Sequence, residues 1–251
     1  MSEVAKELIS YVGGKLADKF IDSFRRNVIE RWSRRRAEEF FEAFVAAVVS
    51  PDIAPNEIES RLSELIADEE KSEVLFDAYR RVCLSRAKVV GPRAIGLLTG
   101  RIIGEGRVAS GIEETWFQVF EDLDDMELLA AQDFYAAAFS KARSGKKTDY
   151  YLHARTLEIE WTVESANFNE ENVDRSLLNL HEALGPWAAK LERLGLISVR
   201  QVETVRDLDT EFDKHITADG KVRMLAHKIV LQREDEACFE IVLKAQPSHS
   251  G

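Results

Sequence analysis

The chain has 251 residues, of which 45% are hydrophobic and 31% are charged. This composition is typical of a folded protein with a buried core and excludes collagen-like and disordered classes, and the length allows one large or two small domains. The formal net charge is −11, which excludes a surface that is basic throughout, so any anion-binding site has to be local. Cys83 and Cys238 lie far apart in the sequence, and we predict two buried free thiols in a reducing compartment.

The amino-terminal sequence lacks the features of a targeting segment. Glu3 and Glu7 stand where a secretory signal carries positive charge. No uncharged apolar run approaches the roughly 18 residues that a membrane span requires. We therefore expect a cytoplasmic protein without an integral membrane segment.

Residues 1–145 have the apolar periodicity of successive helices. An apolar residue recurs at every fourth position over 4–32, and further helical stripes cover 40–49, 58–66, 74–83, 116–120 and 128–139. After Pro92, an apolar helix carries Gly96, Gly100 and Gly104 at intervals of four. Glycines at that spacing share one face and let a second helix approach closely. The sequence predicts a mainly α protein that begins with a multi-helix bundle.

The pattern changes after the polar segment 144–149, which we expect to link two domains. Apolar and polar residues alternate over 157–163, which predicts a strand with one solvent-exposed face. Helical stripes follow over 173–184 and 187–195. We infer a smaller α+β domain over 150–246 and a loose tail at 247–251.

The last elements of this domain are predicted from capping and alternation. Ser198 and Gln201 have the spacing of a capping box, which predicts one more helix, continuing to Phe212. Residues 227–231 and 238–244 are predicted to form paired strands around a charged turn at 233–236. These strands would complete a short antiparallel sheet.

The segment from Trp187 to Ile197, Trp-Ala-Ala-Lys-Leu-Glu-Arg-Leu-Gly-Leu-Ile, predicts a short helix that ends in Gly-Leu-Ile. With a strand before it and a hairpin after it, this segment is similar to a winged-helix module over about 90 residues. The resemblance implies a helix that enters the major groove of DNA, with Lys190 and Arg193 as its basic residues beside Glu192. A structural module, or one that binds another protein, is the alternative.

Positive charge is concentrated in one segment of twelve residues. It contains Arg25, Arg26, Arg31, Trp32, Arg34, Arg35 and Arg36. Guanidinium groups bind phosphate through two parallel hydrogen bonds, and an indole can stack on a base or lie at a membrane interface. At 100° per residue, however, these arginines point almost all the way round a helix. The segment predicts a site for a polyanion or for a protein partner.

Negative charge is concentrated over 113–133, a stretch without Lys or Arg. The predicted acidic partner surface consists of Glu113, Glu114, Glu121, Asp122, Asp124 and Asp125. We expect several of the arginines to pair with this stretch, within one subunit or across a dimer. Such pairing fixes register more than it adds stability.

No motif identifies a catalytic residue. The sequence has no Gly-x-Ser-x-Gly, its glycine-rich stretch lacks the Gly-Lys-Ser/Thr of a phosphate loop, and its histidines lack the spacing of metal ligands. We therefore predict no catalytic residues, no cofactor and no metal site. Glu39 with Glu42, and Glu121 with Asp124, are carboxylate pairs that could hold Mg²⁺, as in all-helical nucleoside-triphosphate pyrophosphohydrolases, although here the pairs are not on successive helices.

Three functional hypotheses follow from the sequence. The first is a non-catalytic protein whose helical domain binds a protein partner or a second copy of itself. The second is a nucleic-acid-binding or regulatory protein that uses the arginine segment 25–36 and the winged-helix-like module. The third is Mg²⁺-dependent nucleotide hydrolysis.

Overall fold

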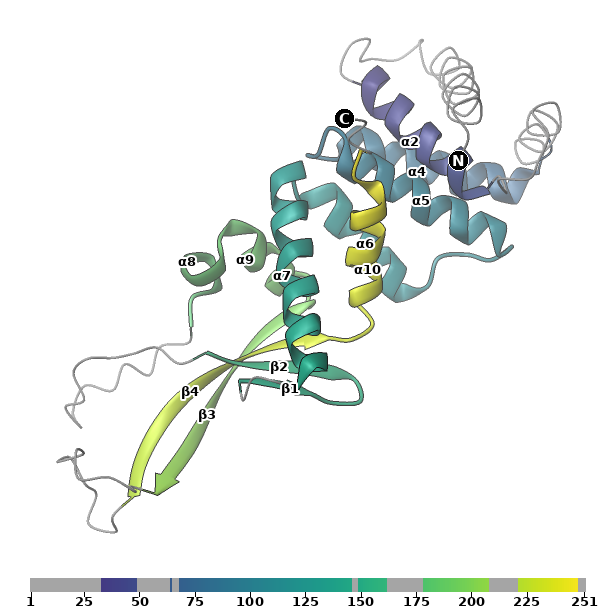
Figure 1. The fold of residues 1–251 in the computed structure, drawn as a ribbon. Helices are drawn as coiled ribbons and strands as arrows, with labels where there is room; N and C mark the ends of the chain where they lie inside the picture. The colour runs from purple at the N-terminus through teal and green to yellow at the C-terminus, as the bar shows by residue number, and fades with distance from the viewer. Residues whose placement is uncertain are drawn as a thin grey trace. The chain divides into compact units, whose positions relative to one another are not determined.

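The computed structural model describes residues 33–48, 64, 68–145, 149–161, 178–207 and 221–247. The chain divides into two compact units, one of Met1–Asp133 with Ala237–Gly251 and one of Phe134–Glu236. Helices predominate, and a four-stranded antiparallel sheet lies in the carboxyl-terminal part (Figure 1). The predicted fold class, a helical bundle followed by a smaller α+β part, is confirmed. None of the described helices is both long and apolar enough to cross a membrane.

The first unit is built around α5 (Val90–Gly104), which packs against α2 (Ser33–Val48), α4 (Glu69–Leu84) and α6 (Gly111–Asp122). Polar side chains cap the helices where they begin. Asp68 Oδ1 accepts from the Lys71 N–H at the start of α4, and Ser110 caps α6. Apolar side chains fill the space between the helices, because the stripe of each helix faces its neighbours. The predicted helical stripes over 74–83, 91–104 and 116–120 are confirmed, and the stripe over 40–49 is confirmed as far as Val48. The predicted helix over 4–32, and the stripe over 58–66 apart from Glu64, lie outside the described residues.

Aromatic side chains of α2 form the middle of this core. Phe40, Phe41 and Phe44 are all at most 1% exposed, and the Phe41 ring stacks on Tyr79 of α4 at 5.9 Å. The ring of Phe40 lies 6.1 Å from that of Phe44, one turn further along α2. Large aromatic surfaces of this kind account for much of the apolar burial that stabilises a helical unit.

The glycines of α5 set how closely α2 can approach. A Cβ placed on Gly96 would lie 2.3 Å from the Phe40 carbonyl oxygen, and one on Gly100 would lie 2.6 Å from the Ala47 Cβ. Both distances are shorter than carbon atoms tolerate, so α2 reaches its position only because these side chains are absent. A Cβ placed on Gly104 would meet nothing within 4 Å. The crossing with α2 therefore depends on two of the three glycines.

The second unit contains a sheet with strand order β1-β2-β4-β3. Its strands are β1 (Tyr150–Leu152), β2 (Thr156–Trp161), β3 (Ile197–Asp207) and β4 (Lys221–Gln232), and all neighbours are antiparallel. The register places Leu157, Leu231 and Ile197 side by side on one face, and all three are buried. The predicted strand over 157–163 is thereby confirmed as far as Trp161, and its last two residues lie outside the described part of the chain.

Helices cover the buried part of this unit. The helix α7 (Asp125–Ser144), whose first turns belong to the first unit, places Phe134 against Trp187 of α9 (Pro186–Arg193), with ring centroids 5.4 Å apart. The Tyr135 hydroxyl donates to the Leu196 carbonyl oxygen at 3.1 Å. A short helix, α8 (Leu180–Leu184), precedes α9. The predicted helices over 128–139 and 187–193 are confirmed.

Two predictions near the carboxyl terminus are wrong. Residues 197–207 form β3 and not a capped helix, because Ile197 and Val199 alternate with Ser198 and Arg200 in the period of a strand. Residues 238–244 lie in the helix α10 (Glu236–Ala245) and not in a strand, since Cys238, Phe239, Ile241, Val242 and Ala245 are buried at helical spacing. Strand β4 instead pairs with β2 and β3.

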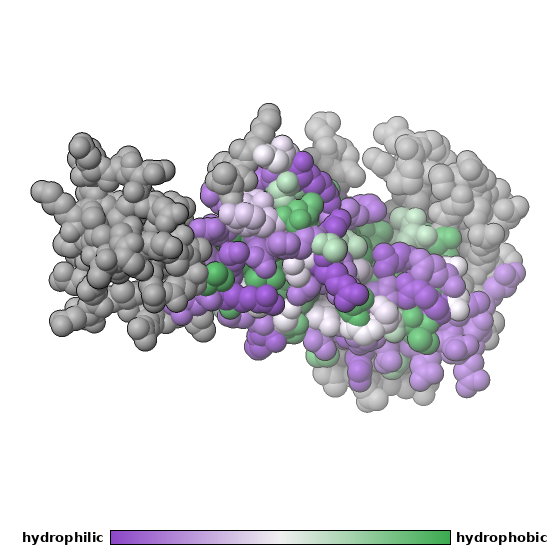
Figure 2. All heavy atoms as spheres, turned by 90° about the horizontal axis from the view of Figure 1, so that it is seen from below, coloured by the Kyte–Doolittle hydropathy of each residue, from purple (hydrophilic) through white to green (hydrophobic). Residues whose placement is uncertain are grey.

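Hydrophobic side chains on the surface lie in small patches. On the face drawn in Figure 2, polar side chains prevail over the described residues, and hydrophobic ones form separate spots. The large hydrophobic side chains that are exposed in the described part are Phe76, Leu84, Val108, Met126, Tyr151, Leu152 and Leu243. Cys238 is buried as predicted, but Cys83 is exposed, so the prediction of two buried thiols is wrong for Cys83.

Candidate functional site

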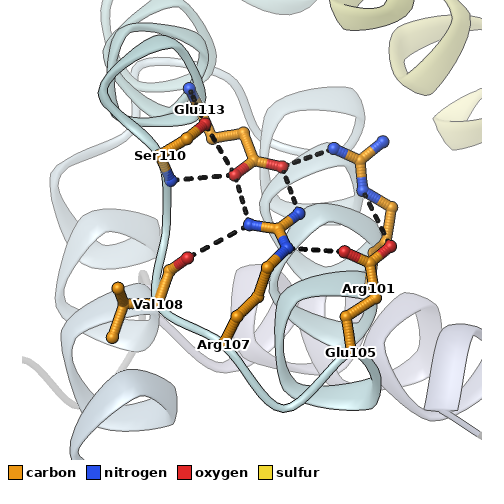
Figure 3. Close-up of polar contacts among 6 residues, drawn as sticks. All are labelled: Arg101, Glu105, Arg107, Val108, Ser110 and Glu113. Carbon is orange, nitrogen blue, oxygen red and sulfur yellow. Dashed lines mark hydrogen bonds and ion pairs between the residues drawn. The ribbon is translucent and has the colours of Figure 1, made fainter.

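The acidic stretch 113–133 is bound by arginines of its own unit. Glu113, at the first turn of α6, is 3% exposed and accepts hydrogen bonds from Arg107 at 2.6 and 2.7 Å and from Arg101 at 2.5 Å (Figure 3). The backbone N–H and the hydroxyl of Ser110 donate to the same carboxylate, each at 2.9 Å. The Glu113 N–H reaches back to the Ser110 hydroxyl, which completes a capping box.

These contacts fix the ionisation state of Glu113. Hydrogen bonds from Arg107 hold the pKa of the Glu113 carboxyl well below its usual range, although burial acts in the opposite direction. The carboxylate therefore remains charged and accepts five hydrogen bonds. A group in this state is a structural connector between α5 and α6 and has no proton to donate near neutral pH.

The other predicted acidic residues also have partners or lie at helix ends. Arg81 of α4 donates to Glu114 and Glu121 of α6, at 2.5 and 2.8 Å. The side chain of Asp125 accepts from the N–H groups of residues 88–90 at the start of α5. Asp124 and Glu127 hydrogen-bond each other's N–H groups at the start of α7, and Asp122 is half-buried at the end of α6.

The predicted arginine site lies only partly within the described residues. Arg25, Arg26, Arg31 and Trp32 lie outside them. Arg34 pairs with Glu38 at 3.1 Å and Arg35 approaches Glu39 at 4.0 Å, each one turn away on α2, and Arg36 is half-buried. Among the described residues, Arg81, Arg101 and Arg107 bind carboxylates of the acidic stretch 113–133.

The carboxylates considered as alternative Mg²⁺ ligands are engaged in the same way. Glu39 and Glu42 both face Arg93, at 3.0 and 3.3 Å. In the part of the chain that the structure describes, no three His, Cys, Asp or Glu side chains converge in a way that could hold a metal ion. A pocket between α4 and the loop at Gly106 has a volume of about 50 Å³, which accommodates a few water molecules and not a nucleotide.

The second unit brings together residues that the sequence suggested only as a resemblance. Helices α8 and α9 are joined by Gly185, which has φ of +106°. This backbone conformation is open to glycine and strained for other residues. Pro186 occupies the first position of α9, where its fixed φ and missing N–H suit a helix start. The sequence thereby encodes a sharp turn between two short helices, as in helix-turn-helix motifs.

One side of α9 is buried, and the residues on the other side are half-buried or exposed. Trp187, Ala188 and Leu191 are buried. On the opposite side, Ala189, Lys190 and Arg193 recur at helical spacing, with Lys190 half-buried and Arg193 exposed. Glu192 is also exposed, but it is turned about 100° round the helix from Arg193. The side of α9 opposite its buried residues therefore carries Lys190 and Arg193, with the exposed Glu192 beside them.

Strands β3 and β4 follow α9 directly and form an antiparallel hairpin whose register runs from Ile197 opposite Leu231 to Asp207 opposite Lys221. Among the described residues, β2 pairs with β4 only as far as His227, so the hairpin continues as a two-stranded ribbon over residues 202–207 and 221–226. Arg200 lies opposite Lys228 in this register and is exposed.

Lys228 is already engaged on the outer face of the sheet. Its ammonium group lies 3.0 Å from Glu158 Oε2 and 5.1 Å from the centre of the Tyr151 ring. The hydrogen bond from Lys228 lowers the pKa of Glu158. Of the opposed pair Arg200 and Lys228, Arg200 is the more exposed cation.

Sequence reasoning missed Arg81, Arg101, Arg107 and Arg200 as functional or structural cations. None of these arginines belongs to the cluster at 25–36, and each meets its partners across the fold or a turn only through folding. The Ser110-x-x-Glu113 capping box was visible in the sequence and could have identified the start of α6. The register that places Arg200 opposite Lys228 depends on long-range strand pairing.

Comparison with known proteins gives no match. The chain matches no protein-family model, no curated protein and no solved structure.

Proposed function

We propose that this chain binds double-stranded DNA through its Phe134–Glu236 unit. The observation that carries the proposal is the order of the described elements of that unit: a helix, the antiparallel strands β1 and β2, two short helices joined at Gly185, and the antiparallel strands β3 and β4, of which β3 follows α9 directly. Strand β2 pairs with the last strand, β4, in the sheet order β1-β2-β4-β3. This arrangement is similar to that of winged-helix modules, in which the second short helix enters the major groove.

The contacts expected at the DNA follow from the basic side of α9. Residues near the amino terminus of a reading helix contact base edges, and Lys and Arg further along contact phosphates. Lys190 and Arg193 occupy one side of α9, and the guanidinium fork of Arg193 suits guanine or phosphate. Arg200, on the strand that follows α9, would contact the adjacent backbone.

The overall charge sets the expected strength and salt dependence. With a net charge of −11, the remainder of the chain repels DNA, so binding relies on a few cations. Each phosphate neutralised releases counterions and contributes about −0.9 to the slope of log affinity against log salt. We expect binding that is measurable at low salt and weakens steeply as salt is raised.

The test is fluorescence anisotropy with a labelled mixed-sequence duplex DNA. The double variant Lys190→Ala/Arg193→Ala is expected to bind about tenfold more weakly or worse, since the loss of roughly 1.4 kcal/mol is a factor of ten. The matched control is Lys141→Ala/Arg155→Ala, which removes two exposed cations of the same unit away from α9. This control is expected to retain wild-type affinity at fixed salt.

Two outcomes would contradict the proposal. One is the absence of duplex binding by the wild-type chain at low salt. The other is an equal loss of affinity in the α9 variant and in the control, which would indicate general charge attraction without a defined site. A labelled duplex RNA of the same sequence should bind more weakly, because the major groove of RNA is too narrow for a helix.

Association of the helical unit with a protein partner or a second copy is the second candidate function. The observation that favours it is the outer side of α4, where Phe76 is 42% exposed and Leu84 is 67% exposed. These residues are two turns apart on the same helix face. This function would accompany DNA binding by the other unit and does not depend on it.

A further inference from the structure

Helix α4 has an exposed face whose charge changes sign along its length. The acidic residues Glu69, Glu70, Glu73 and Asp77 are exposed over residues 69–77, and Arg80 is exposed further along the helix. Arg86 and Lys88, just beyond the helix, are exposed as well. A copy of this face turned end for end would therefore bring the acidic part of one helix toward the basic part of the other.

The same face carries hydrophobic side chains. Glu73, Phe76, Asp77, Arg80 and Leu84 recur at spacings of three and four, so they form one stripe. Acidic residues at the start and basic residues at the end also stabilise a single helix through its dipole. That effect accounts for the charges but not for a phenylalanine and a leucine with 42% and 67% of their surface exposed.

The charges at the middle of the face are available for a partner. The side chains of Asp77 and Arg80 are 58% and 68% exposed, and they approach each other only at 4.0 Å. Such a pair within one helix contributes little, because solvent screens it. An antiparallel copy with its two-fold axis near Ala78 and Tyr79 would place each Asp77 against Arg80 of the other copy and would draw Phe76 and Leu84 into the contact.

We propose that α4 is a self-association surface on which two copies of this chain pair antiparallel about a two-fold axis. This inference deepens the second candidate function and is independent of DNA binding. In a two-fold contact the same surface of each copy meets itself, so it has to be self-complementary. The charge on α4 changes sign along the helix, and an antiparallel copy therefore places opposite charges against each other. The helix has 16 residues and is about 24 Å long, so the contact is at the small end of specific interfaces and the dimer is expected to be weak and concentration-dependent.

Charge reversal tests the contact. The single variants Asp77→Arg and Arg80→Asp each place like charges opposite each other in a homodimer, and each is expected to raise the dimer dissociation constant about tenfold or more. An equimolar mixture of the two variants restores both opposite-charge pairs and should form a heterodimer of wild-type strength. The double variant Asp77→Arg/Arg80→Asp should also regain the homodimer. Light scattering after gel filtration measures the mass, and circular dichroism checks that each variant is folded.

Several results would overturn the proposal. If the wild-type chain remains monomeric at the highest concentration at which it is soluble, this face does not bind a second copy of the chain. A dimer that neither single reversal weakens is formed by another surface. Reversals that weaken the dimer without rescue in the mixture exclude the antiparallel register. Fluorescence anisotropy with duplex DNA is measured on the same variants. The Asp77 and Arg80 changes leave α9 intact, so failure of the self-association proposal and failure of the DNA-binding proposal can be told apart.

Discussion

In the first unit the carboxylates of residues 113–133 meet arginines of the same unit, whereas in the second unit α9 holds Lys190 and Arg193 on the side opposite its buried residues. We propose that the two regions use charge for different purposes. In the first, ion pairs join α4, α5 and α6. In the second, the two cations lie on the side of α9 that is not buried. Changes in the first region should therefore alter stability, and changes on α9 should alter binding.

The largest effect on stability is expected at the crossing of α2 and α5. Gly96→Ala forces a Cβ to within 2.3 Å of the Phe40 carbonyl oxygen, so the α2 backbone has to move. We expect a loss of about 2 to 3 kcal/mol in the free energy of unfolding, measured by urea titration with circular dichroism. The matched control is Gly104→Ala, where a Cβ meets nothing within 4 Å and helix propensity favours alanine by up to about 1 kcal/mol. Equal destabilisation by both changes would contradict the close approach at Gly96.

An effect of similar size is expected at Glu113. Glu113→Ala removes the capping box and leaves Arg101 and Arg107 without their shared carboxylate, at a cost of about 2 to 3 kcal/mol in unfolding free energy. Glu114→Ala, on the next residue of α6, removes a carboxylate whose side chain is 45% exposed and should cost at most about 1 kcal/mol. A Glu113→Ala protein as stable as the Glu114→Ala protein would refute a structural role for the buried carboxylate.

The pH dependence of the unfolding free energy should also reflect the ionisation of Glu113. Because the pKa of Glu113 is lowered by folding, its contribution is fully present above the ordinary glutamate pKa of about 4.3 and is lost as the pH falls below that value. Urea midpoints measured between neutral pH and pH 3 should fall more steeply in the wild type than in Glu113→Gln. Parallel pH profiles for the two proteins would show that the carboxylate gains nothing from its arginine partners.

The smallest effect is expected at the arginines of α2. Arg34 and Glu38 have side chains that are 65% and 49% exposed, so Arg34→Ala should change the unfolding free energy by no more than about 0.5 kcal/mol. Thermal unfolding of this variant beside the wild type measures the difference. A loss several times larger would indicate that Arg34 also supports contacts beyond Glu38.

The sequence predicted individual helices and strands better than the long-range contacts between them. Periodicity identified α2, α4, α5 and the strand at 157–161, because those elements have one clear buried face. It failed at 197–207 and 238–244, since the first has both a capping spacing and an alternating pattern, and the second is a short apolar run that suits a helix or a strand. In both cases long-range packing decides the outcome.

The candidate site was predictable in part for the same reason. Lys190 and Arg193 follow from the local helix, and the glycine at position 185 marks the turn before it. The arginines that bind the acidic stretch can be distant in sequence, as Arg81 and Glu121 illustrate with a separation of 40 positions. No local pattern pairs such residues, so a charge-rich stretch that suggests a partner surface can equally be satisfied within its own unit.

The salt dependence of duplex DNA binding tests the central claim most directly. The account predicts that Lys190→Ala/Arg193→Ala lowers the magnitude of the slope of log affinity against log salt by up to about 2, while Lys141→Ala/Arg155→Ala and Glu113→Gln leave it unchanged. An unchanged slope in the α9 variant, or the same decrease in all three, would contradict the assignment of α9 as the surface that binds DNA.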